Sequence, residues 1–124
     1  MKSQLVIAVD FDGTIVENTW PVLGSPKFGA AYVLKWAKKQ GHILILWTCR
    51  ENHWLDEAKQ VLIEMGLEFD YFNASSPEDI ELYDNDPRKI GFDITIDDKA
   101  SMICWPFQML RIKIASIRKA LKRK

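Results

Sequence analysis

The sequence has few of the residues that mark secreted or zinc-stabilised proteins. Two of its 124 residues are cysteines, Cys49 and Cys104, and they form no C-x-x-C pair and no zinc-binding pattern. Neither a disulfide framework nor a structural zinc site is therefore expected. Reduced thiols in a cytoplasmic protein are the expected state.

Long hydrophobic runs are absent as well. No apolar stretch reaches the roughly 18 residues that a membrane span needs, and no basic-then-apolar leader opens the chain. The sequence shows no repeat, no low-complexity segment and no linker. Its 48% of hydrophobic and 27% of charged residues are typical of an ordinary globular domain. We therefore expect one soluble, cytoplasmic domain over residues 1–124.

Acidic residues are missing from the C-terminal end of the chain. All seventeen lie in the first 98 residues beside nine bases, whereas the remaining residues carry eight bases. A helix is predicted at about 106–122, because apolar residues alternate there at spacings of three and four: Phe107, Leu110, Ile114, Ile117 and Leu121. We expect the apolar side of this helix to pack on the fold and its basic side to face solvent. Self-association, or a phosphate-rich partner such as nucleic acid or an anionic surface, remains the alternative.

Short apolar runs alternate with helical patterns along the rest of the chain. Four runs predict strands: Leu5–Asp10, His42–Thr48, Phe69–Asn73 and Phe92–Asp97. Between them, Ser25-Pro26 predicts the start of a helix that ends at Gly41, and a second helical pattern from Leu55 ends at Gly66. This alternation predicts an α/β fold with a doubly wound, central parallel sheet.

Chemically capable side chains stand at the ends of these strands. Asp10 and Asp12 follow the first run, Thr48 ends the second, and Asp97-Asp98 ends the fourth. In such sheets, ligands bind outside the carboxyl ends of the strands. Because residues two apart on an extended backbone point the same way, Asp10 and Asp12 can flank one site. Carboxylates this close repel one another unless some are protonated or a hard cation such as Mg2+ lies between them.

A phosphoryl group would complement such a cation. The ammonium group of Lys89, the hydroxyl of Thr48 and the backbone N–H groups of residues 11–14 could hold it. An ionised aspartate can then attack phosphorus and form an aspartyl-phosphate. A second carboxylate can protonate the leaving oxygen and later deprotonate the attacking water.

Taken in order, these residues resemble the motifs of the haloacid dehalogenase superfamily of phosphohydrolases. The segments read VIAVDFDGT, ILILWTCR, Lys89 within PRKIGFD, and ITIDDK, over residues 5–99. The resemblance implies a Rossmann-like three-layer sandwich and a phosphatase that cleaves a phosphate monoester through an aspartyl-phosphate on Asp10. The alternative function is a module that keeps the motifs but binds phosphate or nucleic acid without hydrolysing it.

The resemblance also implies a catalytic role for four positions. Asp10 would be the nucleophile and Asp12 the general acid and base. Thr48 would bind a phosphoryl oxygen, and Lys89, with Arg88 as the neighbouring alternative, would neutralise the developing charge.

The implied cofactor is Mg2+. Its ligands would be Asp10, the backbone carbonyl of Asp12 and the pair Asp97-Asp98, with Asp98 favoured as the direct ligand of that pair.

Further residues near the motifs are candidate substrate contacts: Gly13, Thr14, Trp20, Arg50 and His53. A surface arginine explains Arg50 nearly as well, and packing in the core or a flap explains Trp20 better. About a dozen residues separate Thr14 from Ser25 and about fifteen separate Asn73 from Lys89, so neither segment can hold a cap domain. The site is therefore expected to be open, or closed by a neighbouring subunit, and the sequence leaves the phosphorylated substrate unidentified.

Overall fold

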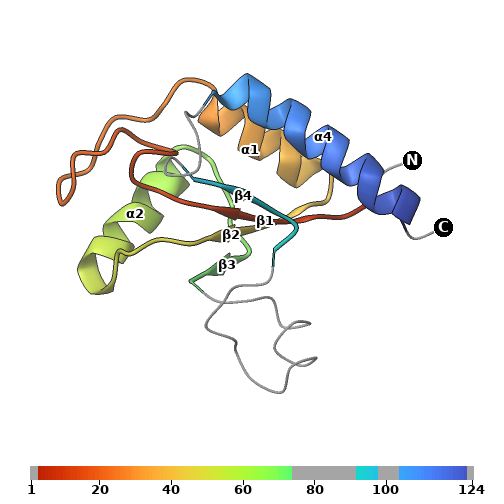
Figure 1. The fold of residues 1–124 in the computed structure, drawn as a ribbon. Helices are drawn as coiled ribbons and strands as arrows, with labels where there is room; N and C mark the ends of the chain where they lie inside the picture. Colours follow the sequence, from red (N-terminus) through yellow and green to blue (C-terminus); the bar gives the residue numbers. More distant parts are fainter. Residues whose placement is uncertain (1–2, 74–91, 98–103, 123–124) are drawn as a thin grey trace, which may run out of the picture.

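The fold alternates strands and helices in the order that the sequence predicts. The computed structural model describes residues 3–73, 92–97 and 104–122. Its elements, drawn in Figure 1, are β1 Val6–Val9, α1 Ala30–Lys39, β2 Ile43–Leu46, α2 Asn52–Glu64, β3 Tyr71–Phe72, β4 Ile94–Ile96 and α4 Trp105–Lys122. All strand pairs are parallel, and the order across the sheet is β3-β2-β1-β4. This confirms the predicted α/β, Rossmann-like class with a central parallel sheet.

The main core lies on one face of the sheet. Strand register sets this face, because Ile7 of β1 lies beside Leu44 of β2 and Ile94 of β4. All three described helices contribute buried side chains to the same core: Ala30, Val33, Leu34 and Ala37 of α1, Ala58 and Leu62 of α2, and Trp105 and Ile112 of α4. Figure 1 shows α1 and α4 lying side by side over the sheet.

The opposite face of the sheet carries a smaller apolar cluster. Ala8 and Ile45 are buried there, with Val6, Ile43 and Tyr71 packed against them. None of the helices in the described part of the chain contributes to this cluster. The described residues therefore show a sheet covered by helices on one face, which is two of the three layers that the resemblance implies.

The first helix begins later than predicted. Ser25 and Pro26 were expected as its N-cap and first residue, but Pro26 instead forms an antiparallel bridge with Val16. The helix starts at Ala30, after Gly29 in the left-handed conformation and without a side-chain cap. The helix start was wrong because a proline that suits a first helical turn suits the edge of a short β-bridge equally well.

α4 matches the predicted helix in its bounds, but a different side of the helix faces the fold. Its buried residues are Trp105, Gln108, Ile112, Ser116 and Ala120. The five residues of the predicted apolar side are instead 42% to 58% exposed: Phe107, Leu110, Ile114, Ile117 and Leu121. The side chain of Ser116 donates a 2.5 Å hydrogen bond to the carbonyl of Ser3, whose N–H is bonded back to Ser116. The expected packing of the apolar side was therefore wrong, because the face that carries Gln108, Ser116 and Ala120 lies against the fold and bonds Ser3, which precedes β1.

Residues 17–25 form a flap rather than a cap domain. The Glu17 N–H donates to the Ser25 carbonyl at 2.8 Å, and the Lys27 N–H donates to the Ile15 carbonyl at 2.8 Å. The two ends of the flap approach each other closely at Gly24. A Cβ added there would lie 2.0 Å from the Glu17 carbonyl oxygen. No cap is therefore inserted between Thr14 and α1, as expected, whereas the segment between Asn73 and Lys89 lies outside the described residues.

Gly24→Ala is expected to open the flap. Because the clash is with backbone, it cannot be relieved by a rotamer change, and we expect a loss of roughly 1–3 kcal/mol in unfolding free energy. Hydrogen exchange at the Glu17 amide should accelerate, since its bond to Ser25 must lengthen. Gly41→Ala is the matched control: its site is left-handed but open within 4 Å, so it should cost stability without changing flap exchange. If the Glu17 amide exchanged hydrogen at the same rate in Gly24→Ala, the close approach of Gly24 to the Glu17 carbonyl would be contradicted.

Candidate active site

A cavity of about 680 Å³ lies where the four strands end. Six of the candidates from the sequence line it: Asp10, Asp12, Trp20, Thr48, Arg50 and Asp97. Lys89 and Asp98, the expected phosphate-neutralising base and metal ligand, lie outside the described residues, as does Arg88. The sheet therefore brings together side chains that are up to 87 positions apart in the sequence.

Asp10 and Asp97 become neighbours because β1 pairs with β4. The Asp10 N–H donates to the carbonyl of Ile96 at 2.9 Å, and Asp97 is the next residue. Both side chains are half-buried and line the cavity. The Thr14 hydroxyl donates to the Asp10 carboxylate at 3.4 Å.

This carboxylate pair fits the donor set of Mg2+. Magnesium usually binds one or two carboxylates and completes its octahedron with water and substrate phosphate. Within residues 3–73, 92–97 and 104–122, no three or more His, Cys, Asp or Glu side chains gather around one point as a metal cluster would need. Two carboxylates beside a cavity with room for water and a phosphate ester suit magnesium better than an ion that requires an all-protein cage.

Hydrogen bonds within the turn and from α4 stabilise the turn after Asp10. Gly13 is left-handed, with φ 85, and its N–H donates to the Val16 carbonyl at 2.8 Å. Thr14 is fully buried, and its carbonyl accepts a 3.0 Å hydrogen bond from the indole N–H of Trp105. Neither Gly13 nor Thr14 lines the cavity, so in this geometry both support the turn and Thr14 bonds Asp10 rather than reaching into open space.

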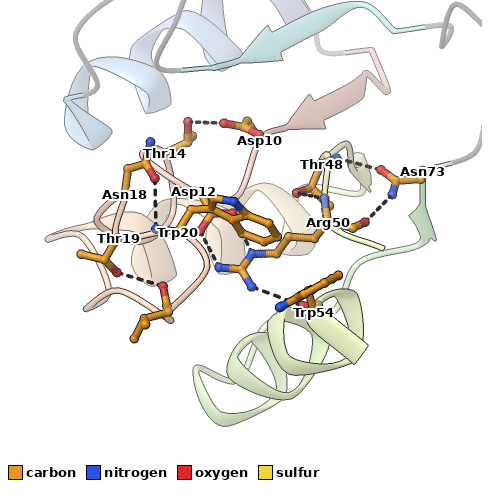
Figure 2. Close-up of polar contacts among 11 residues, drawn as sticks. Asp10, Asp12, Thr14, Asn18, Thr19, Trp20, Thr48, Arg50, Trp54 and Asn73 are labelled. Carbon is orange, nitrogen blue, oxygen red and sulfur yellow. Dashed lines mark hydrogen bonds and ion pairs between the residues drawn. The ribbon is translucent and has the colours of Figure 1, made fainter. Parts of the chain in front are cut away.

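Arg50 forms a two-pronged ion pair with Asp12 (Figure 2). Its Nε and Nη2 atoms each donate to a different carboxylate oxygen at 2.7 Å. The guanidinium lies 4.8 Å from the ring centre of Trp20 and 5.3 Å from that of Phe11, and Nη1 donates to the Trp54 carbonyl at 3.4 Å. The Arg50 side chain is 1% exposed and the Asp12 side chain 16%. The interpretation of Arg50 as a surface arginine was therefore wrong.

Asn73 is a site residue whose role the sequence did not reveal. Its Oδ1 accepts the Thr48 N–H at 2.7 Å, and its Nδ2 donates to the Arg50 carbonyl at 3.5 Å. The hydroxyl of Thr48 accepts the Arg50 N–H at 3.2 Å. An amide side chain after β3 thus fixes the loop that carries Thr48 and Arg50 after β2. The sequence signal that could have indicated this role is the position of Asn73, a polar residue directly after the strand β3.

Aromatic side chains form the rim of the cavity. Trp20, on the flap, is 50% exposed, and Trp47, directly after β2, is 38% exposed. The ring of His53 packs against Trp54 with centroids 4.2 Å apart and the ring planes tilted by 38°, and His53 does not line the cavity. The expected substrate contact of His53 thus has no support in this geometry, whereas Trp20 and Trp47 border the opening.

This chain is similar in sequence and fold to a protein of known structure. A conserved protein from Bacteroides thetaiotaomicron has 38% sequence identity and a TM-score of 0.81, over 90% of this chain and 91% of that one. No protein-family model and no curated protein matches the sequence. Because the identity holds over nearly the full length of both chains, this protein belongs to the same family as the conserved Bacteroides thetaiotaomicron protein.

Proposed function

We propose that this protein is a Mg2+-dependent phosphohydrolase of the haloacid dehalogenase type that cleaves a phosphate monoester. The observation that carries the proposal is the meeting of Asp10, Thr48 and Asp97 in one cavity at the ends of three parallel strands. A nucleophile, a hydroxyl donor and a second carboxylate are the groups that transfer through an aspartyl-phosphate requires.

In the first step, a carboxylate oxygen of Asp10 attacks phosphorus and the bond to the ester oxygen breaks. Asp12 gives a proton to that departing oxygen, so the alcohol leaves neutral. The Thr48 hydroxyl, whose oxygen already accepts the Arg50 N–H, keeps its hydrogen for a phosphoryl oxygen. Mg2+ bound by Asp10, Asp97, Asp98 and the Asp12 carbonyl would supply the positive charge that offsets the phosphate.

In the second step, water attacks phosphorus of the aspartyl-phosphate and Asp12 takes its proton. The bond between phosphorus and the Asp10 oxygen breaks, which releases inorganic phosphate and restores the carboxylate. Before the reaction, Arg50 holds the plane of the Asp12 carboxylate through two hydrogen bonds. A carboxylate that accepts two hydrogen bonds from Arg50 can take a proton from water in this second step. To donate a proton in the first step, one Asp12 oxygen must leave the guanidinium.

Phosphate release from a panel of phosphomonoesters, including p-nitrophenyl phosphate, is expected with Mg2+ and should stop in excess EDTA. Re-addition of Mg2+ should restore it, because the charge on the transferred phosphoryl group is offset by the ion. Circular dichroism in EDTA provides the control that the fold survives. Turnover at an unchanged rate in EDTA would contradict the metal requirement. Binding of phosphate or an oligonucleotide with no turnover of any ester would favour the non-enzymatic module.

A further inference from the structure

The outer side of α4 carries an apolar stripe that no described residue covers, consisting of Phe107, Leu110, Ile114, Ile117 and Leu121. Each of these side chains is 42% to 58% exposed. The stripe covers about 21 Å of helix, at about 1.5 Å per residue. Figure 1 shows α4 as an outer helix of the fold, with α1 beside it. A continuous row of large apolar side chains on a surface marks a contact with something else.

A basic groove runs alongside this stripe, between α4 and β4. It has a volume of about 530 Å³, and the residues that line it include Arg111, Ile114, Arg118, Lys119 and Lys122. The groove also contains Asp93, which is bound by Lys119 at 2.8 Å. Arg118 and Lys122 form no ion pair with any described residue. Because Ile114 belongs to both features, the positive groove and the apolar stripe make one amphipathic surface.

The charge of α4 argues against a second copy of this chain as the partner that covers the apolar stripe. If two α4 helices met antiparallel along their stripes, Ile114 would face its equivalent and Arg111 would lie against Arg118 of the other copy. α4 carries five bases and no acid, and the symmetry of the pair would repeat this repulsion at a second contact between Arg118 and Arg111. The surface is complementary to a partner that is apolar along one line and negatively charged beside it.

We propose that α4 binds the surface of a bilayer that contains anionic phospholipid. The stripe enters the boundary between head groups and acyl chains, and the lipid phosphates lie at the basic groove, as is usual for amphipathic helices with basic flanks. Nucleic acid would use the bases but leave the apolar stripe exposed. Among the described residues no helix is long and apolar enough to cross a membrane, so the attachment is to one surface. Attachment through α4 requires no chemistry at the strand ends.

Co-sedimentation of the full chain with lipid vesicles tests the proposal. We expect binding to phosphatidylcholine vesicles that contain phosphatidylglycerol, little binding to pure phosphatidylcholine, and weaker binding as salt rises. Ile114→Ser with Ile117→Ser, and separately Arg118→Glu with Lys122→Glu, should each lower the partition coefficient by roughly tenfold or more. All four positions are outside the core, so thermal unfolding should be little changed.

Matched controls lie on α2 and α1. Ile63→Ser removes an apolar side chain that is 65% exposed on α2, and Lys35→Glu reverses an exposed charge that lies near Gly66. Both should bind vesicles like the unaltered chain. Equal binding to neutral vesicles, or binding that survives both double substitutions on α4, would overturn the proposal. So would a dimer in solution that Ile114→Ser dissociates while vesicles stay unbound, or oligonucleotide binding with no vesicle binding.

Discussion

Asp10→Asn is expected to lower kcat for phosphomonoester hydrolysis by at least about a thousandfold, because the amide cannot attack phosphorus and carries no charge for Mg2+. The fold should persist. The backbone bond from Asp10 to Ile96, which joins β1 to β4, does not involve the side chain. The Asp10 side chain is half-buried and lines the cavity, so an isosteric amide introduces no steric conflict.

The measurement is the steady-state rate with an aryl phosphate, together with the urea unfolding midpoint of each variant. Asp56→Asn is the matched control, because Asp56 is an exposed residue of α2 away from the cavity and undergoes the same chemical change. It should keep the full rate. If Asp10→Asn kept its activity, the aspartyl-phosphate mechanism would be rejected, whatever the metal dependence.

Breaking the Arg50–Asp12 pair is expected to produce the largest loss of stability. Arg50→Ala should lower the free energy of unfolding by about 3–5 kcal/mol, because it leaves a partly buried carboxylate without its partner. Asp12→Ala should cost a similar amount, since the guanidinium that it leaves behind is 1% exposed. Replacing both, as Arg50→Met with Asp12→Leu, should recover much of this loss because no unpaired charge remains.

Urea denaturation of the two single variants and the double variant measures the coupling between these residues. Lys119→Ala is the control, since its ion pair with Asp93 has side chains 27% and 31% exposed. Exposed pairs contribute only about 0–1 kcal/mol, so this variant should be nearly as stable as the unaltered chain. Equal losses for Arg50→Ala and Lys119→Ala would show that burial does not set the strength of the Arg50 pair.

The strand ends could be predicted because the information is local. Each apolar run is interrupted by the polar residue that lies at the cavity, as at Asp10, Thr48 and Asp97. The rule that parallel strands present their carboxyl ends at one edge then brings the three together without knowledge of strand order.

Arg50 and Asn73 could not be assigned in the same way. Arg50 is two residues from Thr48, but its burial depends on Trp20 from the flap and Phe11 from the first turn packing on its two sides. The role of Asn73 requires that β3 lie next to β2, which only strand pairing establishes. Contacts between segments distant in the chain leave no periodic trace in the sequence.

The packing of α4 shows a second limit of sequence patterns. Periodicity indicates that a helix has an apolar side, but it does not state what covers that side. Here Ser116 hydrogen-bonds to Ser3, and Ala120 lies on the same buried side. Small side chains permit this close approach, so the less apolar side faces the fold and the more apolar side faces outward.

The hydrogen bond between Trp105 and Thr14 bears on how the chain can be shortened. Trp105 begins α4, yet its indole holds the carbonyl of the residue whose hydroxyl reaches Asp10. A chain that stopped before residue 104 would retain every motif residue and still lose the hydrogen bond that supports the turn after Asp10. α4 therefore supports the turn after Asp10 as well as forming an outer surface, and a truncation that removes it changes both at once. Substitutions along the apolar stripe separate the two, because they leave Trp105 in place.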